Sequence, residues 1–221
     1  MDKIYLDFDG YVPRYVSTAC INCSSVMGTS FCSIKDRGCC YYYPKFSLIE
    51  IQRMSKTLKG RKTLDIILKN PGTIVYHFYI HAKGFFDKQG YDRYMRDGGF
   101  CEVEDKTMFF RACPFVKSSY GCTLPPKYRT LVCNFFMCNE LIGSRDAKNG
   151  IDRYLTERER YARWYKWENT NLEGILRERG LNLIDNIYGT LNLLAEIPED
   201  IYEFPKLQPI YLDYSPHSRG A

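Results

Sequence analysis

The sequence predicts an α+β protein, in which an irregular cysteine-cluster region with short strands precedes a C-terminal helical extension. Three observations support this fold class. All ten cysteines lie between Cys20 and Cys138. Short β-branched and aromatic stretches, separated by glycine turns, fill much of the same region. From Ser144 onward the chain is rich in Arg and Glu at helical spacing. We therefore divide the chain into a metal-binding domain, 1–143, and a helical extension with an extended tail, 144–221.

The composition is that of an ordinary globular protein. The chain has 221 residues, of which 45% are hydrophobic and 26% charged, so a core can form without cross-links. The first residues, MDKIYLDFDG, include acidic side chains and no apolar run, and we expect no secretory signal. No apolar stretch of about 18 residues occurs, so we expect no membrane-spanning helix. The expected location is the cytoplasm, where dense cysteines more often bind metal or carry redox chemistry than form disulfides.

The first predicted elements are a turn and a capped helix. The aromatic segment YLDFDGYVPRY has a turn at Asp9 and Gly10. Further on, Ser47 is followed three residues later by Glu50, which is the pattern of a capping box. We therefore expect a helix that begins after Ser47 and ends at Gly60.

The middle of the chain predicts a second helix, one strand and a run of turns. RKTLDIILKNPG reads as a short helix stopped by Asn70 and Pro71. TIVYHFYIH is β-branched and aromatic, which predicts a strand. Its two histidines, His77 and His81, would share one strand face, and we expect packed histidines rather than metal ligands. From 83 to 128 the glycine-rich segments predict short strands and turns.

The C-terminal extension predicts two helices. Apolar residues recur at three-to-four spacing from Ile151 to Leu176, and Gly180 follows. The second, more apolar helix is expected to stop before Pro198, and the proline-punctuated tail is expected to run extended along the surface. Basic and aromatic residues of the first helix are interrupted by glutamates, so we expect a solvated face and no nucleic-acid contact.

Thiol spacing carries the functional prediction. The chain has one short pair, Cys20 and Cys23, and one vicinal pair, Cys39 and Cys40, followed by cysteines at long, unequal intervals. A Cys-x2-Cys turn can direct both sulfurs to one metal. Adjacent residues in an extended chain point to opposite sides. We therefore expect only one of Cys39 and Cys40 to reach a given ion, unless the chain turns sharply there.

Several of these segments match one family. The segments CINC, GCC, ACPF, YGCTLPP and YRTLVCNFF resemble the YkgJ-type cysteine-cluster family, described as a zinc- or iron-chelating domain and named for a CxxCxxCC motif. The likeness covers residues 18–138. It implies a metal site whose ligands come from a pool of eight cysteines: Cys20, Cys23, Cys39, Cys40, Cys113, Cys122, Cys133 and Cys138.

This chain also departs from the family pattern. The gap before the vicinal pair has fifteen residues instead of two and carries the extra Cys32. Thr130 and Asn134 stand where the family has proline and arginine, and Cys138 is a further candidate ligand. These differences leave open which cysteines bind, and whether there is one site or two.

Two functions remain after the residues are weighed. The first is a metal- or iron–sulfur-cluster-binding protein of structural or accessory role, with a [4Fe–4S] cluster slightly favoured over zinc because the spacings are long and irregular. The second is a cluster-dependent enzyme that modifies protein side chains, because a related domain occurs in flagellin lysine methylases. No GxSxG, GxGxxG or P-loop motif is present. We expect no membrane partner and leave a protein partner open.

Overall fold

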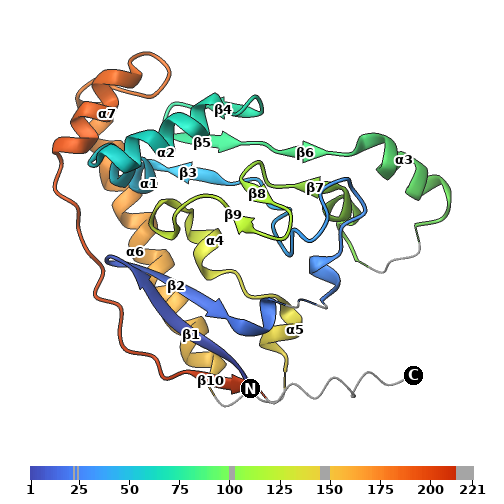
Figure 1. Cartoon of the computed structure of the whole chain (residues 1–221). Coiled ribbons are helices and arrows are strands. Elements are labelled where there is room, and N and C mark those ends of the chain that lie inside the picture. Colours follow the sequence, from blue (N-terminus) through green and yellow to red (C-terminus); the bar gives the residue numbers. More distant parts are fainter. Residues whose placement is uncertain (22, 24, 100–102, 145–149, 213–221) are drawn as a thin grey trace.

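The computed structural model describes residues 1–21, 23, 25–99, 103–144 and 150–212. Helices and small antiparallel sheets of short strands alternate along the chain, and the predicted α+β class is confirmed. Two three-stranded sheets lie in different parts of the molecule, and the cysteine-bearing loops run between them (Figure 1).

The first sheet joins the two ends of the described chain. Strands β1 (Asp2–Asp9) and β2 (Val12–Ser17) form an antiparallel hairpin. Gly10 makes the predicted turn with φ +66°, a conformation that glycine adopts without strain. Strand β10 (Ile210–Leu212) pairs with the other edge of β1, giving the order β10-β1-β2.

The second sheet follows the cysteine-rich loop. It has the order β3-β5-β4, from β3 (Lys45–Ser47), β5 (Tyr79–Ala82) and β4 (Thr73–Val75). The single strand predicted over 73–81 is therefore two antiparallel strands. His77 lies in the connection between them, and only His81 lies in a strand, so the predicted shared face is wrong.

The predicted capping box is present at the start of helix α1 (Leu48–Ser55), where the Glu50 carboxylate accepts a hydrogen bond from the Ser47 N–H at 2.8 Å. Helix α1 ends before Gly60, contrary to the prediction. Gly60 instead lies in the next helix, α2 (Leu58–Lys69). A Cβ at this position would lie 2.3 Å from the Met54 carbonyl oxygen of α1, so glycine lets the two helices meet closely.

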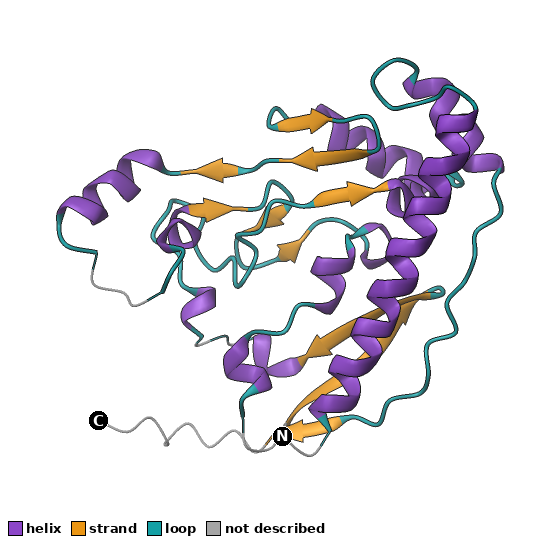
Figure 2. Ribbon diagram, turned by 180° about the vertical axis from the view of Figure 1, so that it is seen from behind, coloured by secondary structure: helices purple, strands orange, loops and turns teal. Residues whose placement is uncertain are grey.

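The long helix α6 (Ile151–Glu178) connects both parts of the protein. Its first half contributes Tyr154 and Tyr161 to the core beneath the first sheet, and its second half contributes Leu172 and Leu176 to the core beneath the second. Figure 2 shows α6 in the foreground, running past both sheets. Helix α7 (Ile187–Glu196) follows, and the chain then returns to β10.

The extension thus packs closely against the cysteine-bearing part of the chain. The hydroxyl of Tyr15 in β2 donates to the Tyr154 carbonyl of α6 at 2.6 Å, and β10 completes the first sheet. The boundary at 143/144 marks a change in amino-acid composition. Residues from both sides of it contribute to each of the two hydrophobic cores.

Short elements carry the remaining cysteines and loops. They are α3 (Lys88–Arg96), α4 (Leu131–Phe135) and α5 (Asn139–Ile142), the paired strands β6 (Phe85–Phe86) and β7 (Arg111–Ala112), the paired strands β8 (Val116–Lys117) and β9 (Gly121–Cys122), and 3-10 turns at Thr18–Cys20, Val26–Gly28, Lys106–Phe110 and Pro126–Tyr128. Helix α3 occupies a stretch where the sequence predicts only turns.

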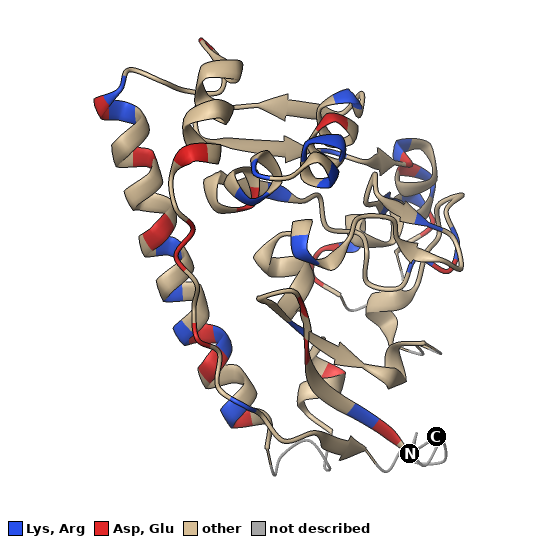
Figure 3. Ribbon diagram, turned by 60° about the vertical axis from the view of Figure 1, so that its left-hand side comes forward, with Lys and Arg blue, Asp and Glu red and all other residues tan. Residues whose placement is uncertain are grey.

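Charged residues of both signs alternate along α6 (Figure 3). Within the part of the chain that the structure describes, no helix is both long and apolar enough to cross a membrane.

Candidate metal centre

A buried arginine holds the cysteine-rich loop in place. Arg37 is only 2% exposed. Its Nη2 donates to the carbonyls of Thr29 and Met108, each at 2.7 Å, and its Nη1 donates to the Gly38 carbonyl. The loop is therefore fixed immediately before Cys39 and Cys40. The sequence did not identify this residue, since a lone arginine in a loop gives no local signal.

The extra Cys32 lies apart from the other thiols. It is buried, its sulfur lies 3.3 Å from the Ser30 hydroxyl, and it donates to the Ile34 carbonyl at 3.7 Å. These local partners account for Cys32 as a packed thiol of the loop.

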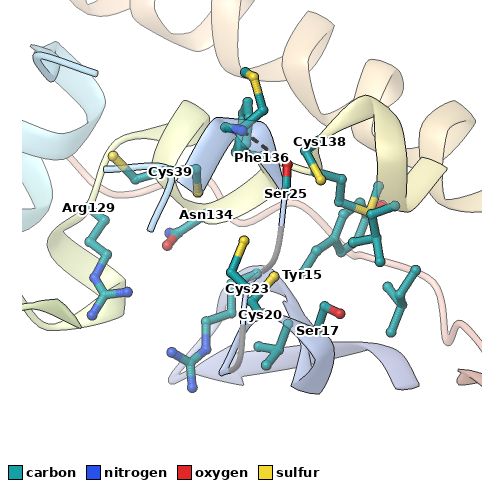
Figure 4. A pocket seen from close by; sticks show the side chains of 17 residues that line it. Tyr15, Ser17, Cys20, Cys23, Ser25, Cys39, Arg129, Asn134, Phe136 and Cys138 are labelled. Atoms are coloured by element: carbon teal, nitrogen blue, oxygen red, sulfur yellow. Dashed lines mark hydrogen bonds between the residues drawn. The ribbon is translucent and has the colours of Figure 1, made fainter. Parts of the chain in front are cut away.

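Five of the eight candidate cysteines line one pocket of about 240 Å³, and the fifth of them, Cys133 in α4, is considered with the other group below. Cys20 and Cys23 come from the start of the loop, Cys39 from its end, and Cys138 from the residue that precedes α5. Figure 4 shows these side chains reaching the same pocket from separate segments. We call Cys20, Cys23, Cys39 and Cys138 the first cysteine set.

The thiols of the first set oppose one another's ionisation. The pKa of Cys39 is raised to about 12, chiefly by burial and in part by the neighbouring thiols of Cys40, Cys20 and Cys23. Loss of solvent also raises the pKa of Cys20, with added contributions from Cys23 and Cys138. Cys20 keeps exposed surface as a residue, but its sulfur lines the pocket. A cation bound among these sulfurs would remove the repulsion between their thiolates.

A polar side chain in the pocket wall lacks part of its bonding. Asn134 is 4% exposed, and its amide nitrogen donates to the Pro126 carbonyl at 3.0 Å. Its side-chain oxygen is buried without a hydrogen-bond partner among the described residues. An acceptor without a donor in a thiol-lined pocket fits a site that a ligand completes.

The other four cysteines gather on the opposite side of the vicinal pair. The Cys113 N–H donates to the Cys40 carbonyl at 2.8 Å, and β8 beside it pairs with β9, which ends at Cys122. Cys113, Cys40 and Cys122 all belong to the core beneath the second sheet. With Cys133 in α4 they form a group that we call the second cysteine set.

Electrostatic contacts tie the second set together. The pKa of Cys133 is raised to about 11. Burial of the thiol is the main cause, the Thr130 hydroxyl at 3.2 Å and Arg129 oppose the rise, and Cys122 and Cys40 contribute to it. Burial also raises the pKa of Cys113, as do Cys133, Cys40 and Cys122. Arg129 is therefore placed where it attracts a thiolate at Cys133.

The chain turns sharply at the vicinal pair. The Cys40 N–H donates to the Arg37 carbonyl at 3.2 Å, and the Tyr41 N–H donates to the Cys39 carbonyl at 2.9 Å. Despite this turn, Cys39 joins the first set and Cys40 the second, so the two adjacent thiols do not converge on one point.

All nine cysteines in the described part of the chain are free thiols, and Cys101 lies outside the described residues. Among the described residues, no three Cys, His, Asp or Glu side chains are arranged to hold a single metal ion.

Comparisons with family models, with curated proteins and with solved structures found no match to this chain. The likeness to the YkgJ-type family remains a prediction based on the cysteine motifs. The class that the fold and site define is an α+β protein with a thiol-lined pocket beside its first sheet.

Proposed function

We propose that this protein binds a thiolate-ligated inorganic centre, in a structural or accessory role. The observation that carries the proposal is the convergence of Cys20, Cys23, Cys39 and Cys138 on one pocket. These residues are up to 118 positions apart, since 138 − 20 = 118. Unpaired thiols gathered from distant segments are the donor set that zinc and iron–sulfur clusters require.

The pocket favours an iron–sulfur cluster of [4Fe–4S] type over zinc. Zinc–sulfur bonds of about 2.3 Å would bring four sulfurs to within roughly 3.8 Å of one another. The described cysteines do not make so tight a group, and the pocket of about 240 Å³ has the volume of roughly eight waters. A cluster keeps its four thiolates farther apart, because irons and sulfides lie between them.

The same volume argues against an organic substrate in this pocket. Ligand pockets usually measure roughly 300–1,000 Å³, and this one is smaller even before a centre fills it. The alternative function, a cluster-dependent enzyme that modifies protein side chains, would need further space beside the centre. We therefore propose the non-enzymatic role first.

Free thiols also agree with a reducing compartment such as the cytoplasm. We propose no membrane or nucleic-acid partner for this function. Glutamates interrupt the basic face of α6, which would weaken contact with phosphates (Figure 3).

Anaerobic purification followed by elemental analysis tests the proposal. We expect brown protein with visible thiolate-to-iron absorption, together with iron and acid-labile sulfide bound to the chain. Colourless protein with stoichiometric zinc would keep the thiolate centre but replace the cluster by an ion. Protein that carries neither iron nor zinc after purification from metal-supplemented cells would refute the proposed function.

A further inference from the structure

We propose that the chain binds two separate thiophilic metal centres, one in each cysteine set, and that the peptide bond between Cys39 and Cys40 divides them. The inference rests on the proposed function and extends it. The first centre would use Cys20, Cys23, Cys39 and Cys138, and the second would use Cys40, Cys113, Cys122 and Cys133.

Position within the fold separates the two sets. All four members of the first set line the pocket beside β2 and α5. Three members of the second set pack instead into the core beneath the second sheet, namely Cys40, Cys113 and Cys122. Cys133 also lines the pocket, so it borders both groups. Its sulfur accepts from the Thr130 hydroxyl at 3.2 Å, and we assign it to the second set.

Electrostatic influence follows the same division. The pKa of Cys20 responds to Cys23 and Cys138, whereas the pKa of Cys113 responds to Cys133, Cys40 and Cys122. Across the two sets, the pKa of Cys39 also responds to its neighbour Cys40. A single shared centre would bring sulfurs of both sets together at several points.

The charges near the second set suit a separate centre. Four thiolate ligands give a metal centre a negative net charge, which a protein interior tolerates only with compensation. Arg129 and Arg37 both favour the thiolate of Cys40. Arg129 donates to the carbonyls of Leu124 at 2.8 Å and Cys122 at 3.4 Å, and it also lines the pocket of the first set.

Metal analysis of three variants tests the division. Cys20 and Cys23 are replaced together by serine in one variant, and Cys113 and Cys122 in another. Cys32→Ser is the matched control, because Cys32 is a buried loop thiol outside both sets. Iron, zinc and sulfide per chain are measured after anaerobic purification. We expect each double variant to lose about half of the wild-type metal and the control to lose none.

Chemical labelling of the wild-type protein avoids variants that fail to fold. The metal-loaded chain is treated with a chelator and alkylated at intervals, and tandem mass spectrometry reads each cysteine, with Cys39 and Cys40 resolved by fragmentation. We expect two groups of four cysteines that become reactive at different rates, with the membership given above. One common rate for all eight would overturn the two-centre inference.

The outcomes separate this inference from the proposed function. If the wild-type protein holds metal and either double substitution removes all of it, one shared centre exists and only the two-centre inference fails. If one double substitution leaves the metal content at the wild-type value, that set holds no centre and the inference fails again. If the wild-type chain binds no metal, both fall together.

Discussion

The hydroxyl of Tyr165 in α6 donates a hydrogen bond to the carboxylate of Glu50 in α1, at the point where these two helices meet. Glu50 is 1% exposed, and its carboxylate also accepts from the N–H groups of Ser47 at 2.8 Å and Leu131 at 3.2 Å. One buried carboxylate thus joins α1, α6 and the start of α4. It connects the C-terminal extension to the helix that carries Cys133.

Tyr165→Phe should destabilise the protein by about 1–3 kcal/mol, because it removes one of the donors to a buried carboxylate. Chemical denaturation of the metal-loaded protein measures this change in the free energy of unfolding. Tyr188→Phe is the control, since Tyr188 is 81% exposed on α7. Equal stability of the two variants would show that Glu50 does not depend on Tyr165.

Glu50 should also make stability depend on pH. Burial raises the pKa of its carboxyl above the ordinary 4.5, and the bond from Tyr165 and the charge of Arg53 only partly oppose that rise. The folded chain therefore binds this proton more tightly than the unfolded chain does. The resulting stability is fully present below about pH 4.5 and is lost as the pH rises through the folded-state pKa.

Glu50→Gln removes this titration. The free energy of unfolding of the wild-type protein should fall from pH 4.5 upward relative to that of the variant. The measurement is the difference between the two proteins in how steeply the free energy of unfolding changes with pH. Absolute stabilities are not compared, because the new amide of the variant turns an N–H toward a neighbouring donor. Parallel curves for the two proteins would contradict the predicted contribution of Glu50.

Two glycines at contrasting positions should respond in opposite ways to alanine. A Cβ at Gly60 would lie 2.3 Å from the Met54 carbonyl oxygen, so Gly60→Ala should cost about 1–3 kcal/mol through overpacking. A Cβ at Gly174, within α6, would meet nothing within 4 Å. Gly174→Ala should therefore stabilise the protein by about 0.5–1 kcal/mol, because alanine favours the helix. Thermal melts of both variants decide the sign, and a loss of stability at Gly174 would be the contrary result.

The sequence predicted those elements whose formation depends on residues close together in the chain. The capping box at Ser47 and Glu50, the turn at Gly10 and the long helix α6 all follow from residues a few positions apart. Helix α3 was missed although Tyr91 and Tyr94 lie one turn apart and pack against Phe110, because the segment is short and polar and contains Gly90, which reads as a turn.

Relationships between distant segments could not be predicted. Pairing of β10 with β1 joins Ile210 to Ile4 across nearly the whole chain. Likewise, the motifs identified eight cysteines as a pool, but their division into two sets depends on where Cys113 and Cys138 lie in the folded chain. Only tertiary structure determines which thiols share a space.

Removal of the inorganic centre should loosen the cysteine-bearing loops. Structural zinc contributes roughly 10–16 kcal/mol in small peptides, whereas an entire domain is stable by about 5–15 kcal/mol. Even a loss of about 5 kcal/mol would lower the thermal midpoint by roughly 10–20 °C in a chain of this length. We therefore expect a chelator to lower the midpoint by at least that amount, with a metal-saturated chelator at the same concentration as the control.

Hydrogen exchange would show where this stability resides. After chelation, the amides of 25–43 and 111–138 should exchange faster, because these segments carry most of the thiols and contain only short helices and strands. Helix α2 contains no cysteine and packs on α1, so its amides should lose less protection than those two segments. If circular dichroism, the thermal midpoint and the exchange rates all stayed constant after every metal ion had been removed, the centre would have no structural role, because the apo chain would already have its full stability.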